Sequence, residues 1–115
     1  MTYFVKKGNK YNNTKQLYNG SRYDSKKESS YAQELDLRVK AKDIKSWEKQ
    51  FNLELRVNGY KICRWKIDFK IIHNDDSIEF VEVKGFETYD YILKRKLFEA
   101  LKDEMFPGSV LTIIK

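Results

Sequence analysis

Three polar residues in the middle of the chain, Asp68, Glu82 and Lys84, can hold a divalent metal ion and stabilise negative charge. Glu82 and Lys84 are two residues apart, and side chains at that spacing on a strand point to the same face. Carboxylate oxygens are preferred ligands of Mg²⁺ and Mn²⁺, whereas Zn²⁺ prefers nitrogen and sulfur. The pattern predicts a Mg²⁺ (or Mn²⁺) site at Asp68 and Glu82, with Lys84 as the cation that neutralises an attacked phosphate. The alternative for Lys84 is an ordinary surface ion pair.

The spacing between the two acids predicts that they face each other across a β-hairpin. If residues 73–77 form the connecting loop, Ile72 pairs with Ile78, and the same antiparallel register places Asp68 opposite Glu82. Two carboxylates in such a pair repel each other and weaken the sheet, and a divalent cation between them reverses this penalty. The alternative is that one carboxylate turns outward and pairs with a neighbouring lysine.

Glu28 is a candidate third acid at the same site. It recurs at helical spacing with Ala32, Leu35 and Val39, which places it on the expected buried face of a helix. Its carboxylate would then point towards the sheet. The alternative is a capping role, because Ser25 and Glu28 match the capping-box pattern in which the glutamate reaches back to the N-cap backbone.

An α/β fold with one sheet is expected to position these residues. Alternating apolar and polar residues over 61–72 predict a strand with one buried face, and the Asn-Gly pair within Val57–Tyr60 predicts a tight hairpin turn. The resulting α-β-β-β-α-β order predicts a mixed sheet with helices packed on it. The expected elements are a helix at 25–42, strands at 44–55, 61–72 and 78–84, a helix at 88–105 and a strand at 111–114.

A basic arm at residues 1–23 precedes the expected single domain at 24–115. The arm holds five basic residues and no acid, while the whole chain carries a net charge of +6, so the rest is nearly neutral. Four tyrosines lie between these charges and could stack on bases, which favours a nucleic-acid partner over a solubilising tail. For Lys94 and Arg95 of the expected second helix, the alternative to phosphate contacts is that they lie on a solvated helix face. The candidate nucleic-acid contacts are Lys6, Lys7, Lys10, Lys15, Arg22, Lys26, Lys27, Lys94 and Arg95.

The composition excludes several classes of protein. The single cysteine, Cys63, cannot form an internal disulfide, so a reducing, cytoplasmic setting is expected. No segment approaches the ~20 apolar residues needed to span a bilayer, so no membrane partner is expected. A chain of 115 residues has room for one compact domain.

Asp68 followed by Glu82-Val83-Lys84 matches the D…E-x-K core of the PD-(D/E)XK nuclease superfamily, which the chain therefore resembles. It is more closely similar to a phage-encoded branch of small proteins, Holliday-junction-resolvase-like and otherwise of unknown function. One departure is Ile67, which stands where the superfamily's nominal proline would be. The resembling stretches are Asn9-Lys10-Tyr11-Asn12, Tyr23-Asp24-Ser25-Lys26-Lys27-Glu28, Trp47-Glu48-Lys49-Gln50, Ile67-Asp68-Phe69, Val81-Glu82-Val83-Lys84-Gly85-Phe86 and Lys96-Leu97-Phe98-Glu99.

The resemblance implies a role for each matched residue in a restriction-endonuclease-like core. Asp68 and Glu82 would be metal ligands, with the Val83 carbonyl as a third ligand. Glu28 would be an accessory ligand, and Lys84 the catalytic lysine.

The resemblance also implies a substrate. The expected activity is Mg²⁺-dependent hydrolysis of phosphodiester bonds in DNA, including branched DNA such as four-way junctions, by a homodimer. Gln50 resembles a polar position that some members bring to the active centre, and its alternative is a surface strand residue. The alternative functions are a nuclease for other DNA structures, a non-catalytic nucleic-acid-binding module and an interaction protein that uses its aromatic surface.

Overall fold

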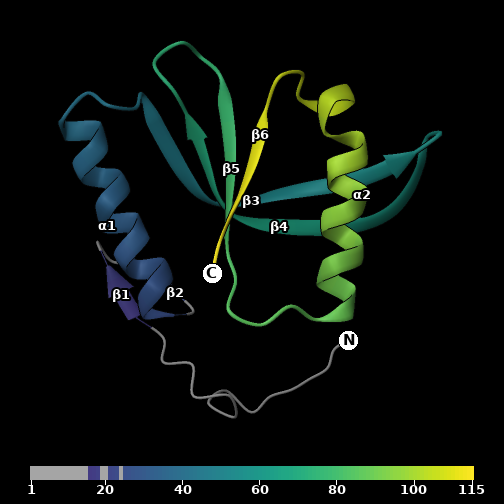
Figure 1. Ribbon diagram of the computed structural model, residues 1–115, viewed down its shortest axis with the longest axis horizontal. Coiled ribbons are helices and arrows are strands. Elements are labelled where there is room, and N and C mark those ends of the chain that lie inside the picture. Colours follow the sequence, from purple (N-terminus) through teal and green to yellow (C-terminus); the bar gives the residue numbers. More distant parts are fainter. Residues whose placement is uncertain (1–15, 19–20, 24) are drawn as a thin grey trace. The chain divides into compact units, whose positions relative to one another are not determined.

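The computed structural model describes residues 16–18, 21–23 and 25–115, and the side chains from Ser25 onward. The predicted order of helix, three strands, helix and strand is confirmed, with two short strands before it (Figure 1). The chain divides into two units, residues 1–38 and 39–115. The elements are β1 (Gln16–Tyr18), β2 (Ser21–Tyr23), α1 (Lys26–Lys40), β3 (Ser46–Val57), β4 (Tyr60–Ile72), β5 (Ile78–Val83), α2 (Tyr89–Met105) and β6 (Val110–Ile114).

Two short strands lie in the first unit, where the sequence up to Tyr23 lacks a regular period and predicts a loop or short irregular strand. β1 and β2 form an antiparallel pair in which Gln16 stands opposite Tyr23. The Asn19-Gly20 pair, whose composition predicts a turn, lies outside the described residues.

Helix α1 begins where the sequence predicts. The Ser25 hydroxyl accepts a hydrogen bond from the Glu28 N–H at 3.2 Å, which confirms Ser25 as the N-cap. Ala32 and Leu35 of the predicted stripe are buried, and Glu28 is half-buried. The stripe therefore marks the inner side of the helix, as its period of 3.6 residues requires.

One mixed sheet of four strands, in the order β3-β4-β5-β6, forms the centre of the second unit. The β3–β4 and β4–β5 pairs are antiparallel, and the β5–β6 pair is parallel. The β3–β4 turn uses Asn58 and Gly59 at φ values of 52° and 84°, the left-handed conformation that a tight hairpin turn requires. The expected α/β layout, like that of the restriction endonucleases, is present in this order and sheet. Strand β3 lies two residues later than predicted, because Ile44 is buried ahead of it without strand pairing.

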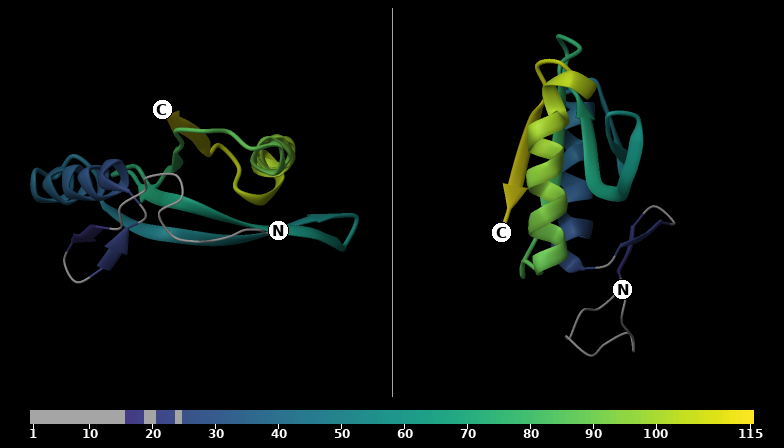
Figure 2. Two further views of the ribbon diagram at one scale, coloured as in Figure 1. Left: turned by 90° about the horizontal axis from the view of Figure 1, so that it is seen from below. Right: turned by 90° about the vertical axis from the view of Figure 1, so that its right-hand side faces the viewer.

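Helix α2 packs on the sheet and closes the core of the second unit. Its N-cap is Thr88, whose hydroxyl accepts a hydrogen bond from the Tyr91 N–H at 3.2 Å. The helix lies over the outer half of the β3–β4 hairpin (Figure 2). Neither described helix is long and apolar enough to cross a bilayer. The buried core cluster consists of Leu53, Leu55, Trp65, Ile67, Phe80, Tyr91 and Phe98.

Candidate active site

The β4–β5 hairpin brings Asp68 and Glu82 together where its backbone pairing ends. The predicted pairing of Ile72 with Ile78 is confirmed, and the same register continues up to the step before the two acids. Glu82 Oε1 accepts a hydrogen bond from the Asp68 N–H at 3.1 Å, and Asp68 Oδ2 accepts one from the Val83 N–H at 2.8 Å. Each carboxylate therefore reaches across to the backbone of the other strand, and the predicted juxtaposition is confirmed.

Glu82 is buried beside a like charge. The residue is 4% exposed. Burial is the main cause that raises the pKa of its carboxyl to about 7, and the negative charge of Asp68 raises it further. The hydrogen bond from Asp68 and the positive charge of Lys84 lower this pKa, but they do not offset the other two causes. The protein by itself leaves negative charge at this position poorly compensated.

Lys84 lies on the same side as Glu82. Its backbone N–H donates a hydrogen bond to the Ile114 carbonyl at 2.8 Å, which fixes the end of β5 against β6. Its ammonium nitrogen lies 4.6 Å from the centre of the Tyr91 ring, a distance at which the ring face attracts a cation. The charge of Glu82 also acts on the Tyr91 phenol. Tyr91 is thus a common neighbour of the two residues, as expected for side chains that share a face.

Gln50 occupies an irregular point in the interior of β3. It has a φ of 53°, the left-handed conformation that costs a residue other than glycine about 1–3 kcal/mol. The strand pairs on either side keep one register, which places Gln50 opposite Asp68 without a ladder pair of its own. The long β3–β4 hairpin changes direction along its length (Figure 1). Gln50, Asp68 and Glu82 therefore stand in a row across three neighbouring strands.

The two carboxylates fit a hard divalent cation. They supply oxygen ligands and a negative charge that favours cation binding, which are the properties that Mg²⁺ and Mn²⁺ require. Among the described residues, no group of three or more His, Cys, Asp or Glu side chains has a geometry that could hold a metal ion. A metal at this place would therefore rest on Asp68, Glu82 and backbone or water oxygens. Glu28 belongs to the first unit, and its convergence with these two acids stays a prediction.

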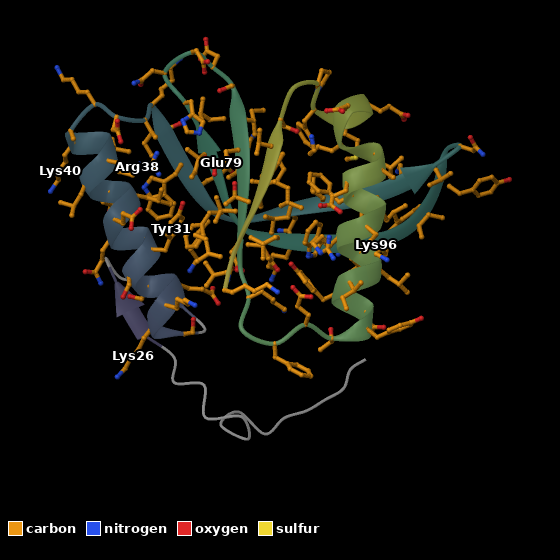
Figure 3. The ribbon with its side chains drawn as sticks, in the orientation of Figure 1. Lys26, Tyr31, Arg38, Lys40, Glu79 and Lys96 are labelled. Carbon is orange, nitrogen blue, oxygen red and sulfur yellow. The ribbon has the colours of Figure 1, made fainter. Side chains whose placement is uncertain are left out.

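The predicted DNA contacts of the helices lie in different surroundings. Lys26 and Lys27 are exposed in the first turn of α1, and Lys26 points away from the helix (Figure 3). Lys94 and Arg95 are half-buried on α2, and Arg95 pairs with Glu99 at 3.0 Å, as the solvated-face alternative expects. Of the arm residues, Lys6, Lys7, Lys10 and Lys15 lie outside the described residues, and Arg22 belongs to β2, whose side chains are outside them too.

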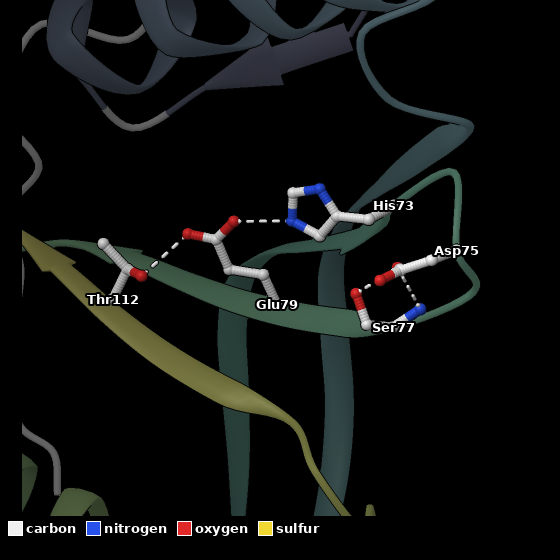
Figure 4. Close-up of polar contacts among 5 residues, drawn as sticks. All are labelled: His73, Asp75, Ser77, Glu79 and Thr112. Atoms are coloured by element: carbon white, nitrogen blue, oxygen red, sulfur yellow. Dashed lines mark hydrogen bonds and ion pairs between the residues drawn. The ribbon is translucent and has the colours of Figure 1, made fainter.

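A second polar cluster lies at the other end of β5. Glu79 accepts a hydrogen bond from the Thr112 hydroxyl at 2.7 Å, and its other oxygen lies 2.9 Å from His73 Nε2 (Figure 4). In the adjoining loop, Asp75 accepts hydrogen bonds from the backbone N–H and the hydroxyl of Ser77, and these bonds lower the pKa of the Asp75 carboxyl. These side chains have partners within the cluster, which fits a structural role.

Tyr91 is a site residue that the sequence patterns did not single out. It is 5% exposed and lies in the first turn of α2, where its ring contacts Lys84 and its phenol feels the charges of Glu82 and Asp68. The available signal was its spacing of seven residues from Phe98, which places both rings on the buried face of the helix. That spacing predicts a core residue and gives no reason to expect its hydroxyl beside the acids.

Comparison with known proteins gives one match. A family model described as a protein of unknown function, DUF1064, matches residues 8–112. No curated protein matches the chain, and no solved structure matches it.

Proposed function

The chain belongs to the DUF1064 family of proteins of unknown function, and from its own residues we propose that it is a metal-dependent DNA endonuclease of the PD-(D/E)XK type. The observation that carries the proposal is the hydrogen-bonded pairing of Asp68 with Glu82, followed two residues later by Lys84. Two adjacent carboxylates and a lysine on one side are suited to bind a divalent ion and a phosphate together. The proposed reaction is hydrolysis of a phosphodiester bond.

Mg²⁺ (or Mn²⁺) is the proposed cofactor. Asp68 and Glu82 supply the carboxylate oxygens that hold it, and the Val83 carbonyl and Glu28 are proposed as further ligands. When bound, the ion supplies Lewis acidity to the scissile phosphate and to the attacking water. The environment of Glu82 supports this role, because burial and the charge of Asp68 raise the pKa of its carboxyl and a bound cation would stabilise the charged form.

Lys84 and Gln50 are proposed to act on the reacting groups. The Lys84 ammonium contacts a phosphate oxygen and stabilises the negative charge that grows in the transition state. The Tyr91 ring holds this ammonium in place, so little reorganisation is needed during the reaction. The Gln50 amide offers both donors and an acceptor, and its row with Asp68 and Glu82 supports a proposed role in orienting a water molecule. Its unfavourable backbone conformation supports a functional role.

The proposed substrate is DNA, and branched DNA such as a four-way junction is the preferred form. The net charge of +6 favours a polyanionic partner, and the basic arm would contact backbone phosphates. Cutting two strands of a junction requires two active centres, so the proposal includes a homodimer. The closer resemblance to the resolvase-like branch supports this substrate.

A panel of labelled DNA substrates tests the proposal. Junction, flap, duplex and single-stranded DNA are incubated with Mg²⁺, Mn²⁺ or EDTA, and products are resolved on a denaturing gel. The wild-type protein is expected to cut at least one substrate with either metal and none with EDTA. We expect Lys84→Ala to lower the single-turnover rate about 10²–10³-fold with near-wild-type DNA binding, because the lysine acts on the transition state more than on affinity.

The matched control is Glu79→Gln, which removes a carboxylate from the same strand outside the proposed site. It is expected to cut at the wild-type rate, whereas Glu82→Gln loses the activity. Absence of cutting on every substrate would contradict the proposal, and so would cutting by Lys84→Ala at the wild-type rate.

A further inference from the structure

Within the described part of the chain, the hydroxyl of Tyr91 is a buried polar atom without a hydrogen-bond partner. Among the described residues only one other side-chain atom shares this property, the Ser109 hydroxyl in the turn between α2 and β6. More than nine in ten buried polar groups in folded proteins find a partner, because an unpaired one costs about 1–3 kcal/mol. An unpaired hydroxyl in a residue that is 5% exposed therefore requires an explanation.

The surroundings of this hydroxyl are those of the proposed active site. The charged groups that act on the phenol are Glu82, Arg95, Glu87 and Asp68, and two of them are the paired carboxylates. Burial is the main cause that raises the pKa of Tyr91 to about 12, so the phenol keeps its proton at neutral pH. It is therefore available as a hydrogen-bond donor beside the acids.

A second donor lies against the same side chain. The Lys84 ammonium lies 4.6 Å from the centre of the Tyr91 ring, so the ring holds a cation while its hydroxyl lacks a partner. A neutral hydroxyl and a fixed ammonium together are complementary to an anion with several oxygens, such as the phosphate of a nucleic-acid strand. A cation at the carboxylates would attract the same phosphate.

We propose that Tyr91 is a further substrate-binding residue, whose buried hydroxyl donates a hydrogen bond to a phosphate oxygen of the DNA strand held beside Lys84. The inference rests on the proposed function for the identity of its ligand. It adds a contact from α2 to a site whose central carboxylates, Asp68 and Glu82, lie on strands. Because the hydroxyl gains its partner only from the ligand, it stabilises the complex and not the free protein.

Tyr91→Phe separates this role from a structural one, because it removes the hydroxyl and keeps the ring that holds Lys84. The matched control is Tyr89→Phe, the same substitution two residues away on a side chain that is 79% exposed. Binding of a fluorescently labelled duplex and of a labelled four-way junction is measured by anisotropy in EDTA, where no cutting takes place. Melting temperatures of the three proteins without DNA are measured alongside.

We expect Tyr91→Phe to weaken DNA binding about tenfold, the usual loss for one hydrogen bond to a charged group. Its melting temperature is expected to stay the same or rise, because a buried hydroxyl without a partner is removed. Tyr89→Phe is expected to change neither quantity. Unchanged DNA binding by Tyr91→Phe would overturn the inference, and so would a lowered melting temperature, which would show that the hydroxyl has a structural partner.

The endonuclease proposal and the inference about Tyr91 can fail independently of each other. If wild-type protein binds DNA but cuts no substrate with Mg²⁺ or Mn²⁺, the endonuclease proposal falls while the binding comparison still decides the role of Tyr91. If the protein cuts DNA and Tyr91→Phe binds as wild type, only the inference about Tyr91 falls.

Discussion

Glu79 and Glu82 lie three residues apart on β5, and the protein treats their carboxylates in opposite ways. Glu79 is surrounded by partners, since the Thr112 hydroxyl donates to one oxygen and His73 contacts the other. Glu82 accepts a hydrogen bond from the Asp68 backbone N–H, and the negative charge of the Asp68 carboxylate also acts on it. Both oxygens of Glu79 have partners from the fold, whereas Glu82 has a like charge at its side.

The difference separates a structural acid from a functional one. A carboxylate that needs no further partner stabilises the native state, and it gains nothing from an ion. A buried carboxylate beside another one destabilises the metal-free protein and so favours binding of a cation. The fold therefore stores at Glu82 an unfavourable interaction that a ligand can relieve.

The strongest way to test the contrast is the pH dependence of stability without metal. The pKa of Glu82 is raised from 4.5 to about 7 in the folded protein, so the folded state binds the proton more tightly than the unfolded chain. The stability that this proton contributes is present below pH 4.5 and is lost as the pH rises through about 7. In EDTA, we expect the wild type to lose at most about 3 kcal/mol between pH 5 and pH 8 relative to Glu82→Gln.

Urea unfolding at both pH values measures this difference. Glu79→Gln serves as the control and is expected to keep the wild-type loss. The lowered pKa values of Glu54 and Asp75 do not interfere, because groups of this kind change stability only at more acidic pH. Equal pH profiles for wild type and Glu82→Gln would contradict the proposed difference between Glu82 and Glu79.

A somewhat smaller effect is expected from Mg²⁺ at pH 8. An ion that binds only the folded protein adds about 2.7 kcal/mol when its concentration is 100 times the dissociation constant. We expect the melting temperature of wild type and of Glu79→Gln to rise on titration with Mg²⁺, and that of Glu82→Gln to stay constant. The affinity should be weaker at pH 5.5, because the ion must displace the proton from Glu82. A rise of equal size in Glu82→Gln would place the ion elsewhere.

The smallest expected effect tests the structural role of Glu79. Thr112→Val removes the hydroxyl that donates to Glu79 and keeps a similar shape. Because Glu79 is partly exposed, the loss in the free energy of unfolding should be about 1 kcal/mol, the usual value for one hydrogen bond. The response to Mg²⁺ is expected to stay as in wild type. A changed response would mean that the Glu79 cluster and the proposed metal site are coupled.

The parts of the site that could be predicted from the sequence depend on loop length and on residue spacing within each strand. The loop at 73–77 fixed the β4–β5 register, and the period of two along a strand then placed Asp68 against Glu82. The order of elements followed from the same periodicities and from the Asn-Gly turn. These features are determined by neighbours in the chain, so a single sequence contains them.

The features that could not be predicted from the sequence depend on contacts between segments that are distant in the chain. Thr112 lies in β6, far along the chain from Glu79, so no local pattern distinguishes the environment of Glu79 from that of Glu82. The left-handed conformation of Gln50 departs from the regular strand that its surroundings predict. The position of Tyr91 depends on how α2 lies over β4 and β5. Each of these follows from tertiary packing and not from local propensity.

The hydrogen bond from the Lys84 backbone to Ile114 links the timing of synthesis to the proposed chemistry. Residue 114 is translated well after the β4–β5 hairpin, and the parallel β5–β6 pair forms only once α2 has crossed back over the sheet. A nascent chain still lacking β6 carries both acids, but it lacks the hydrogen bond that fixes the Lys84 backbone at the end of β5. The end of β5, and with it the backbone position of Lys84, is therefore fixed only after β6 has been made.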